Sequence, residues 1–518
     1  MSEKIAIIGA GIGGLASAMR LAHRGCDVTV LERHAHVGGK MRTMDSVAGP
    51  VDAGPTVMTL RPIFEELFAA CDTRLADHVT LCPLEILARH RWSDGTILDL
   101  SADVATSEAT IADAFGGDAA QAFAAFHGKA RTLFQAFEAP MMQAANPRVL
   151  DIAGVVLRNP GVIPALLTGP TLSKALARDF AHPKLQQLFG RYATYVGGSP
   201  TAAPALLSLI WYAEAQGVWA VDGGMHKLAQ AMATVAEKAG ARIRLNTGVT
   251  AMAATGDGAR LTLADGEILA DKVIFNGDPK ALFDGRLGPA PRRAVKRRNV
   301  TPRSLSAYVW SFAAKSTGTA PSHHNVYFAD QTNSEFPHIA ADTLPPDPTL
   351  YVCAQDRGIG QPKGAERFEI ILNGPPRQGT TPDPEEQAKC QEMTFTRLAQ
   401  MGLTLDTTPD LRALTTPEQF NKLFPASDGS LYGRSPHGMM AAFKRPMART
   451  AIPWLYLAGG GTHPGAGIPM AATSGRLAAE AILTDLASTS MSARTGMPGG
   501  MSTASATAAR AQSPSSPS

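Results

Sequence analysis

The fold of this chain follows from one segment, Lys4-Ile-Ala-Ile-Ile-Gly-Ala-Gly-Ile-Gly-Gly-Leu-Ala-Ser-Ala-Met19. It predicts a short buried strand over residues 5–8, then a glycine turn, then a helix of small and apolar residues. Gly9 permits the tight turn, Gly11 lets the backbone approach a pyrophosphate, and Gly14 allows the helix to pack closely on the strand. The free N–H groups and partial positive charge at the start of the helix favour phosphate groups.

A second strand, residues 27–32, strengthens this interpretation. It ends in Glu32, at the spacing expected for a contact with the ribose hydroxyls of a dinucleotide. The negative charge of Glu32 would repel a 2′-phosphate, so the sequence predicts an adenine dinucleotide without that group, FAD or NAD rather than NADP. The strand before the turn and the helix after it disfavour an ordinary strand–turn–helix without a ligand.

The composition is that of a globular protein. The 518 residues are enough for two or three domains, and 45% of them are hydrophobic and 18% charged. The net charge is +3, and no basic run is interleaved with aromatic residues, so we expect no nucleic-acid partner.

The cysteines and the hydropathy pattern indicate a reducing compartment and no membrane-spanning helix. The five cysteines are odd in number and show no CxxC spacing, which favours isolated thiols over disulfides or a zinc site. Because a core strand follows the first residues directly, we expect no cleaved signal peptide. No apolar run reaches the roughly 18 residues of a membrane-spanning helix. The cysteines are Cys26, Cys71, Cys82, Cys353 and Cys390.

Further glycine motifs follow in order along the chain. The pair Gly38-Gly39 predicts a turn, and Lys40 and Arg42 after it suit contacts with phosphate or flavin carbonyl groups. The stretch 51–56 holds Asp52 and Thr56, which could also be simple turn and cap residues. Residues 221–240 predict a glycine turn and an amphipathic helix, and residues 454–482 predict a strand, a glycine loop and a helix with proline in its first turn.

These motifs, in this order, resemble the flavin amine oxidase and phytoene desaturase superfamily. The resemblance implies FAD, with the GG-x-x-R region along its pyrophosphate and flavin, the backbone near Val249 facing the adenine, and the last helix directed at the flavin pyrimidine ring. The dipole of that helix would stabilise negative charge on a reduced flavin. The residues so implied in cofactor binding are Gly9, Gly11, Gly14, Glu32, Gly39, Lys40, Arg42, Val249, Gly459, Gly460, Gly467 and Ile468.

The expected fold class is α/β: a Rossmann-like FAD-binding domain of the type with two dinucleotide-binding motifs, carrying inserted helical and antiparallel-sheet substrate regions. FAD-binding parts are expected at residues 1–75, 218–290 and 426–485. A helical region for substrate and membrane contact is expected at 76–217, a substrate-domain sheet at 291–425, and a disordered tail rich in Ser, Thr, Ala and Pro at 486–518.

Two segments of the helical region bear on the substrate. Residues 152–167 are strongly apolar and broken by two prolines, so they could dip into one membrane leaflet or form plain helical core. Residues 191–205 resemble the stretch of carotenoid desaturases that leads towards the substrate channel. Tyr192 and Tyr195 within it could equally be ordinary packing aromatics.

Residues 430–446 resemble the hydroxycarotenoid 3,4-desaturases, the hydroxyneurosporene or methoxyneurosporene dehydrogenases of phototrophic bacteria. The resemblance implies an FAD-dependent oxidoreductase that introduces a C-3,4 double bond into an acyclic 1-hydroxy or 1-methoxy carotenoid, in biosynthesis of spheroidene-type or spirilloxanthin-type photosynthetic pigments. Hydride passes to the flavin, and oxygen or a quinone is the electron acceptor. It also implies a bacterial enzyme in the cytoplasm, peripheral on the inner face of the cytoplasmic membrane, with a long apolar polyene as substrate.

Other functions remain open at this point. One is a phytoene desaturase, carotenoid isomerase, amine oxidase or porphyrinogen oxidase of the same superfamily, and another is a non-catalytic lipid-binding escort protein of the same fold. An amine oxidase usually has an aromatic pair at the flavin, and the last glycine loop shows none. An escort protein would have little use for Lys40, Arg42 and a complete last glycine loop.

The catalytic residues are not evident, because no Ser-His-Asp or Cys-His set and no useful carboxylate pair is present. His463 is the candidate, and Arg434 and His437 are polar residues that could contact a substrate hydroxyl or the flavin or serve the loop alone. We expect no metal site. The pair His323-His324 has no Asp, Glu or Cys nearby at a helical spacing.

Overall fold

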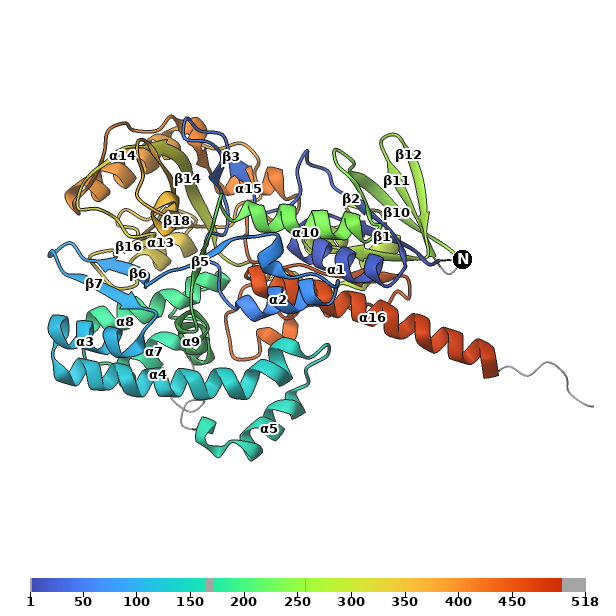
Figure 1. Cartoon of the computed structure of the whole chain (residues 1–518), viewed down its shortest axis with the longest axis horizontal. Coiled ribbons are helices and arrows are strands. Elements are labelled where there is room, and N and C mark those ends of the chain that lie inside the picture. Colours follow the sequence, from blue (N-terminus) through green and yellow to red (C-terminus); the bar gives the residue numbers. More distant parts are fainter. Residues whose placement is uncertain (1, 164–170, 257, 496–518) are drawn as a thin grey trace, which may run out of the picture.

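The computed structural model describes residues 2–163, 171–256 and 258–495. Near one end of the molecule, five parallel strands form a sheet in the order β21-β13-β1-β2-β9 (Figure 1). Such a sheet is covered on both faces, so its central strands are rich in buried Ile and Val, whereas the edge strand β9 carries two arginines. The strands are β1 (Lys4–Ile8), β2 (Asp27–Leu31), β9 (Arg242–Arg244), β13 (Lys272–Phe275) and β21 (Leu455–Leu457).

Three helices from distant parts of the chain cover one face of this sheet. They are α1 (Ile12–His23), α10 (His226–Lys238) and α16 (Ile468–Thr495), and α1 contacts both of the others. Ile5 and Ile7 of β1 belong to the same apolar core as these helices. The predicted α/β fold assembled from separated pieces of chain is therefore confirmed.

The other face of the sheet packs on a small antiparallel sheet. Ala6 and Val273 share an apolar core with strands β10 (Val249–Thr255), β11 (Gly258–Leu263) and β12 (Gly266–Ala270). A tight turn joins β11 to β12, where Leu263 pairs with Gly266.

A seven-stranded sheet forms the second lobe, in the order β20-β14-β18-β17-β16-β6-β7. All its neighbours are antiparallel except the parallel pair β16–β6. The expectation of a helical region at 76–217 is wrong for β6 and β7, because β6 pairs with β16, far along the chain, and β7 pairs with β6 at the edge of the sheet. The strands are β20 (Leu414–Thr415), β14 (Ser306–Ala314), β18 (Glu366–Gly374), β17 (Leu350–Ala354), β16 (His324–Tyr327), β6 (Ile86–Arg91) and β7 (Ile97–Ser101).

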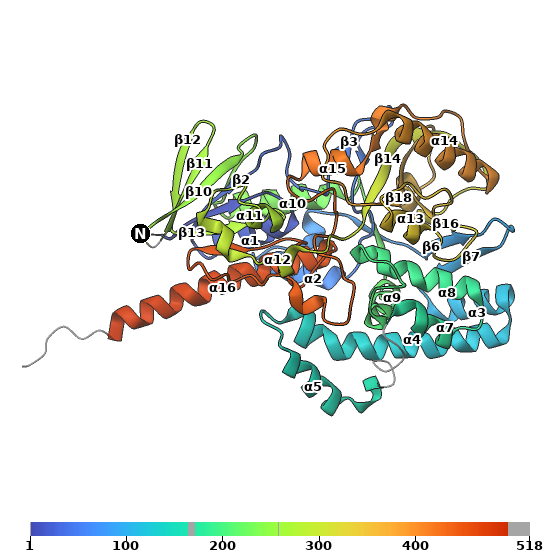
Figure 2. The same ribbon diagram turned by 180° about the vertical axis from the view of Figure 1, so that it is seen from behind.

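Helices gather beside this sheet around a core of buried aromatic rings that includes Phe123, Phe189 and Trp211 (Figure 2). Gly116, at φ +91°, separates the first two helices at the predicted break. No helix of the described residues is long and apolar enough to cross a membrane. The helices are α3 (Val104–Phe115), α4 (Gly117–Phe137), α5 (Val149–Arg158), α7 (Leu172–Asp179), α8 (Pro183–Gly190) and α9 (Leu209–Ala215).

The prediction that the chain is disordered from residue 486 onward is wrong for residues 486–495, which are helical. Helix α16 continues to Thr495, with Leu483 and Leu486 still packed against the core. Residues 496–518 and the end of the apolar segment, 164–167, lie outside the described residues.

The other strands have two or three residues each, and the other α-helices range from four residues in α11 to 17 in α14. They are β3 (Thr43–Met44), β4 (Val51–Asp52), β5 (Leu81–Pro83), β8 (Trp219–Val221), β15 (Ser316–Gly318), β19 (Leu403–Leu405), α2 (Arg61–Ala69), α11 (Lys280–Phe283), α12 (Arg297–Val300), α13 (Glu335–Ala340), α14 (Pro384–Gln400) and α15 (Pro417–Leu423).

Candidate functional site

The turn between β1 and α1 and the loop before α16 open onto one cavity of about 760 Å³. Gly11 from one end of the chain and Gly467 from the other both line it. Glu32, after β2, and Val249, at the start of β10, line it as well. This volume lies within the range of about 300–1,000 Å³ that is typical of small-molecule sites. The two glycine motifs therefore converge on a single ligand-sized space.

Glycine is required where α1 begins. Gly9 adopts φ +101°, a conformation that favours glycine. A Cβ atom on Gly14 would lie 2.1 Å from the carbonyl oxygen of Gly9. Asn276, after β13, donates from Nδ2 to the same oxygen at 3.0 Å. Gly14 therefore supports the turn from behind and does not itself line the cavity.

Glu32 is buried and accepts two backbone hydrogen bonds. The N–H groups of Ala10 and His34 each donate to one carboxylate oxygen at 2.8 Å. These bonds fix the carboxylate at the edge of the cavity, and each oxygen can accept further hydrogen bonds. Glu32 thus keeps capacity for the two hydroxyl groups of a ribose.

Lys40 brings a buried positive charge to the cavity. Its Nζ donates to the carbonyl oxygen of Leu431. Burial is the main cause that lowers the pKa of Lys40 to about 8; Asp278 opposes this shift, and the positive charges of Arg303 and Arg445 add to it. An anionic ligand in the cavity would stabilise the charged form of Lys40, which burial disfavours.

Arg42 lies behind the cavity wall instead of in it. Its Nη2 donates to Thr415 Oγ1 at 2.7 Å, and its guanidinium lies 5.9 Å from the ring centre of Phe420, which lines the cavity. Gly39, on the same turn, does line the cavity. A direct contact between Arg42 and FAD stays a prediction.

The loop before α16 contributes Gly459, Gly460, Gly467 and Ile468 to the cavity lining. Pro469 occupies the first turn of α16, where its missing N–H costs nothing. The start of this helix therefore borders the ligand space, where its free N–H groups could serve a ligand, and its contact with the flavin stays a prediction.

These residues fit an extended FAD molecule. Glu32 suits its ribose, the start of α1 suits its pyrophosphate, and the start of α16 suits a ring that gains negative charge on reduction. The NAD alternative leaves the second helix start without a partner.

A second cavity, of about 260 Å³, adjoins the first. Its wall is largely apolar and includes Val57, Ile210 and Phe328. The two cavities share lining residues, so they meet at the loop after β4, at β18 and at the start of α16. The shared residues are Pro55, Ile371, Tyr432, Gly467 and Ile468.

A buried polar cluster borders the second cavity, and sequence reasoning missed its acid. Glu214 accepts from Tyr192 Oη at 2.9 Å and from Tyr195 Oη at 2.8 Å, while Arg191 donates to Tyr195 Oη at 2.6 Å. Burial raises the pKa of both tyrosines. The only signal in the sequence was an acidic residue inside the apolar helix α9.

His463, Arg434 and His437 line neither of these cavities. His463 Nε2 lies 2.9 Å from the carbonyl oxygen of Ala144, and burial lowers the pKa of its imidazole. Arg434 donates to backbone carbonyl groups, and His437 Nε2 accepts from the N–H of Ser199. All three therefore tie loops together in the folded chain.

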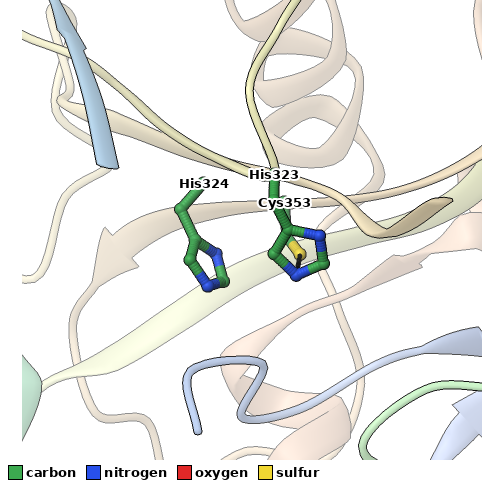
Figure 3. A group of neighbouring side chains, drawn as sticks. All are labelled: His323, His324 and Cys353. Atoms are coloured by element: carbon green, nitrogen blue, oxygen red, sulfur yellow. Dashed lines mark hydrogen bonds between the residues drawn. The ribbon is translucent and has the colours of Figure 1, made fainter. Parts of the chain in front are cut away.

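Strand pairing brings a cysteine to the histidine pair (Figure 3). His323, His324 and Cys353 are buried, and potential ligand atoms of the three lie within 4.8 Å of one another. His323 Nε2 lies 3.7 Å from Cys353 Sγ, and His324 Nδ1 lies 2.7 Å from Tyr351 Oη. These hydrogen bonds use one nitrogen of each imidazole. Cys353 comes from the neighbouring strand β17, so a search for ligands at helical spacing along the sequence could not find it. The absence of a metal here stays a prediction.

The chain matches a family model described as flavin containing amine oxidoreductase over residues 12–328. A hydroxyneurosporene desaturase of Cereibacter sphaeroides is 54% identical over 490 residues, which cover 94% of this chain and 99% of that protein. One of Rhodobacter capsulatus is 48% identical over 487 residues, covering 93% and 98%.

Solved structures agree on the architecture. A triple mutant of putrescine oxidase superposes with a TM-score of 0.57 at 14% identity, covering 93% of this chain and 99% of that one. At this identity the likeness shows the fold alone.

Proposed function

Because the chain belongs to the family of flavin-containing amine oxidoreductases, we propose that it introduces the C-3,4 double bond into an acyclic 1-hydroxycarotenoid or its 1-methoxy counterpart. The cofactor of this oxidoreductase is FAD. The reaction class comes from its similarity to hydroxyneurosporene desaturases, and the position of the new bond is our assignment.

The observation that carries this proposal is the wall common to the two cavities. A polyene end lying in the second cavity would meet the flavin at Pro55, Ile371 and Ile468. When bound, the flavin supplies the acceptor for a hydride. The apolar side chains of the second cavity would hold the substrate end and exclude water, and the start of α16 would stabilise negative charge as it develops.

Membrane association and reoxidation complete the proposal. Helix α5 exposes Leu150 and Leu157, which are 75% and 85% accessible, between Arg148 and Arg158. Such a surface suits the inner face of a bacterial cytoplasmic membrane, where carotenoids dissolve and anionic headgroups attract arginine. Oxygen or a quinone then takes the electrons.

The test is expression in a strain that makes 1-hydroxyneurosporene but cannot desaturate it further. We expect extracted pigment with one more conjugated bond and a red-shifted absorption spectrum. Strains that make only phytoene or neurosporene serve as controls. A shift in the phytoene strain would reassign the protein as a phytoene desaturase, altered geometry without a new bond would indicate an isomerase, and unchanged pigment in every strain would refute the proposal.

A further inference from the structure

The second cavity has a polar end as well as an apolar wall. Glu335, the first residue of α13, lines it and is 5% exposed, and Asn373 of β18 lines it beside Glu335. Asn373 Nδ2 donates to Glu335 Oε1 at 3.2 Å, and the N–H of Thr349 donates to Oε2 at 3.2 Å. The carboxylate is therefore held in place on both oxygens.

No salt bridge neutralises Glu335 within the part of the chain that the structure describes. Burial, with a smaller contribution from Asp347, raises the pKa of Glu335 to about 7 against the hydrogen bonds from Thr349 and Asn373, which lower it. A buried carboxyl group costs free energy unless it is well hydrogen-bonded. Two contacts at 3.2 Å leave lone pairs on both oxygens and one N–H of Asn373 without a partner from the protein. Such groups at a cavity wall suit a small polar ligand group.

The other polar cluster of this cavity offers less to a ligand. Glu214 already accepts from Tyr192 and Tyr195 at 2.8–2.9 Å and lies 3.7 Å from Arg191. The arginine lies over the rings of both tyrosines. Within the described residues, Nε and Nη2 of Arg191 have no hydrogen-bond partner, so this cluster keeps donors for a ligand, but its carboxylate already accepts from both tyrosines.

The position of Asn373 relative to the flavin cavity matches the chemistry of the substrate. Ile371 of the same strand lines both cavities, and residues two apart on a strand face the same side about 7 Å apart. The carbon atoms that lose hydrogen lie only a few bonds from the hydroxyl group. At ~1.5 Å per bond, the distance between them is ~5 Å. A hydroxyl group held at Asn373 would therefore bring the reacting carbons to Ile371 and the flavin.

We propose that Glu335 and Asn373 form the subsite that binds the end-group hydroxyl of the carotenoid and so selects hydroxylated substrates. The inference rests on the proposed function. A hydroxyl group can donate to Glu335 and accept from Asn373 together. A methoxy group can only accept, and a hydrocarbon end would leave both side chains unpaired. The subsite therefore ranks the three end groups as hydroxyl, then methoxy, then hydrocarbon.

The test measures binding to the purified FAD-loaded enzyme in detergent micelles, by quenching of flavin fluorescence. The probes are 1-hydroxyneurosporene, 1-methoxyneurosporene and neurosporene. For the wild type we expect at least tenfold tighter binding of the hydroxylated probe than of neurosporene, because unpaired buried polar groups penalise the analogue. In Glu335→Gln this ratio falls to about threefold or less. The control is Glu418→Gln, which changes a buried carboxylate outside both cavities and should keep the ratio.

The outcomes separate this inference from the proposed function. If the wild type desaturates 1-hydroxyneurosporene but binds all three probes equally, the subsite is refuted and the activity stands. If no carotenoid is desaturated, the proposed function fails. If Glu335→Gln does not retain flavin, Asn373→Leu takes its place, and an unchanged ratio in a folded variant overturns the inference.

Discussion

A Cβ atom on Gly13 would lie 2.7 Å from the backbone nitrogen of Gly459, so the two glycine loops touch backbone to backbone. It would also lie 2.7 Å from Oδ1 of Asn276. One loop opens α1 and the other follows β21, and the sheet order β21-β13-β1 brings them together. The ligand space thus depends on a contact that leaves no room for a side chain.

Gly13→Ala should therefore empty the cofactor site. The added methyl group must displace either backbone or Asn276, at a cost of about 1–3 kcal/mol. We expect purified protein with less than a tenth of the wild-type flavin content, measured by absorbance at the flavin band against total protein. The matched control is Gly128→Ala in α4, where an added Cβ meets nothing within 4 Å. That variant should retain flavin, and its free energy of unfolding should rise by up to about 1 kcal/mol, because alanine favours a helix more than glycine does. Equal flavin loss in both variants would contradict the prediction.

The affinity for FAD should fall as Lys40 loses its proton. The pKa of this lysine is lowered to about 8, so the ammonium is charged below pH 8 and neutral above it. A charged donor near the pyrophosphate contributes about 1.5–3 kcal/mol. We expect FAD to bind at least tenfold more weakly at pH 9.5 than at pH 7, in fluorescence titrations of the apoprotein.

Lys40→Met should bind FAD weakly at both pH values, so the difference in affinity between pH 7 and pH 9.5 should disappear. The stability of the apoprotein should change in the opposite direction, because the unfolded chain keeps this proton up to about pH 10.4 and the folded chain loses it near 8. Unfolding free energy therefore rises between these values. Lys389→Met, at an exposed site on α14, is the control and should keep the pH step in affinity.

The cofactor half of the site was predictable because its signals are local. Gly9, Gly11 and Glu32 lie within one strand–turn–helix–strand unit, where spacing alone fixes geometry. The substrate half was not predictable, because strand pairing creates it. Glu335 and Asn373 meet only when α13 packs beside β18, and Cys353 reaches His323 only through the pairing of β16 with β17. The pairing of β6 with β16 was missed for the same reason, whereas β6 and β7 form a local hairpin around the turn at Asp94 and Gly95 that the sequence analysis overlooked.

His463→Ala should leave the chemistry intact. The histidine lines neither cavity, and its Nε2 is used by the carbonyl oxygen of Ala144. Losing that hydrogen bond should lower the free energy of unfolding by about 1–3 kcal/mol. We expect turnover per bound flavin within threefold of wild type, with a lower melting temperature. A hundredfold loss of turnover at full flavin content would restore His463 as a catalytic candidate.

Vesicle binding should depend on the exposed leucines of α5. Leu150 and Leu157 are exposed large apolar side chains of this helix, and burying each in the membrane interface is worth about 1.5–3 kcal/mol. The double variant Leu150→Glu/Leu157→Glu should therefore co-sediment with anionic vesicles at least tenfold less than wild type. Its flavin content should be normal, because the residues that line the FAD cavity do not belong to α5. Leu269→Glu, at an exposed position on β12 near the opposite end of the molecule, should sediment like wild type. Equal loss in both variants would mean that added negative charge, and not the α5 surface, controls binding.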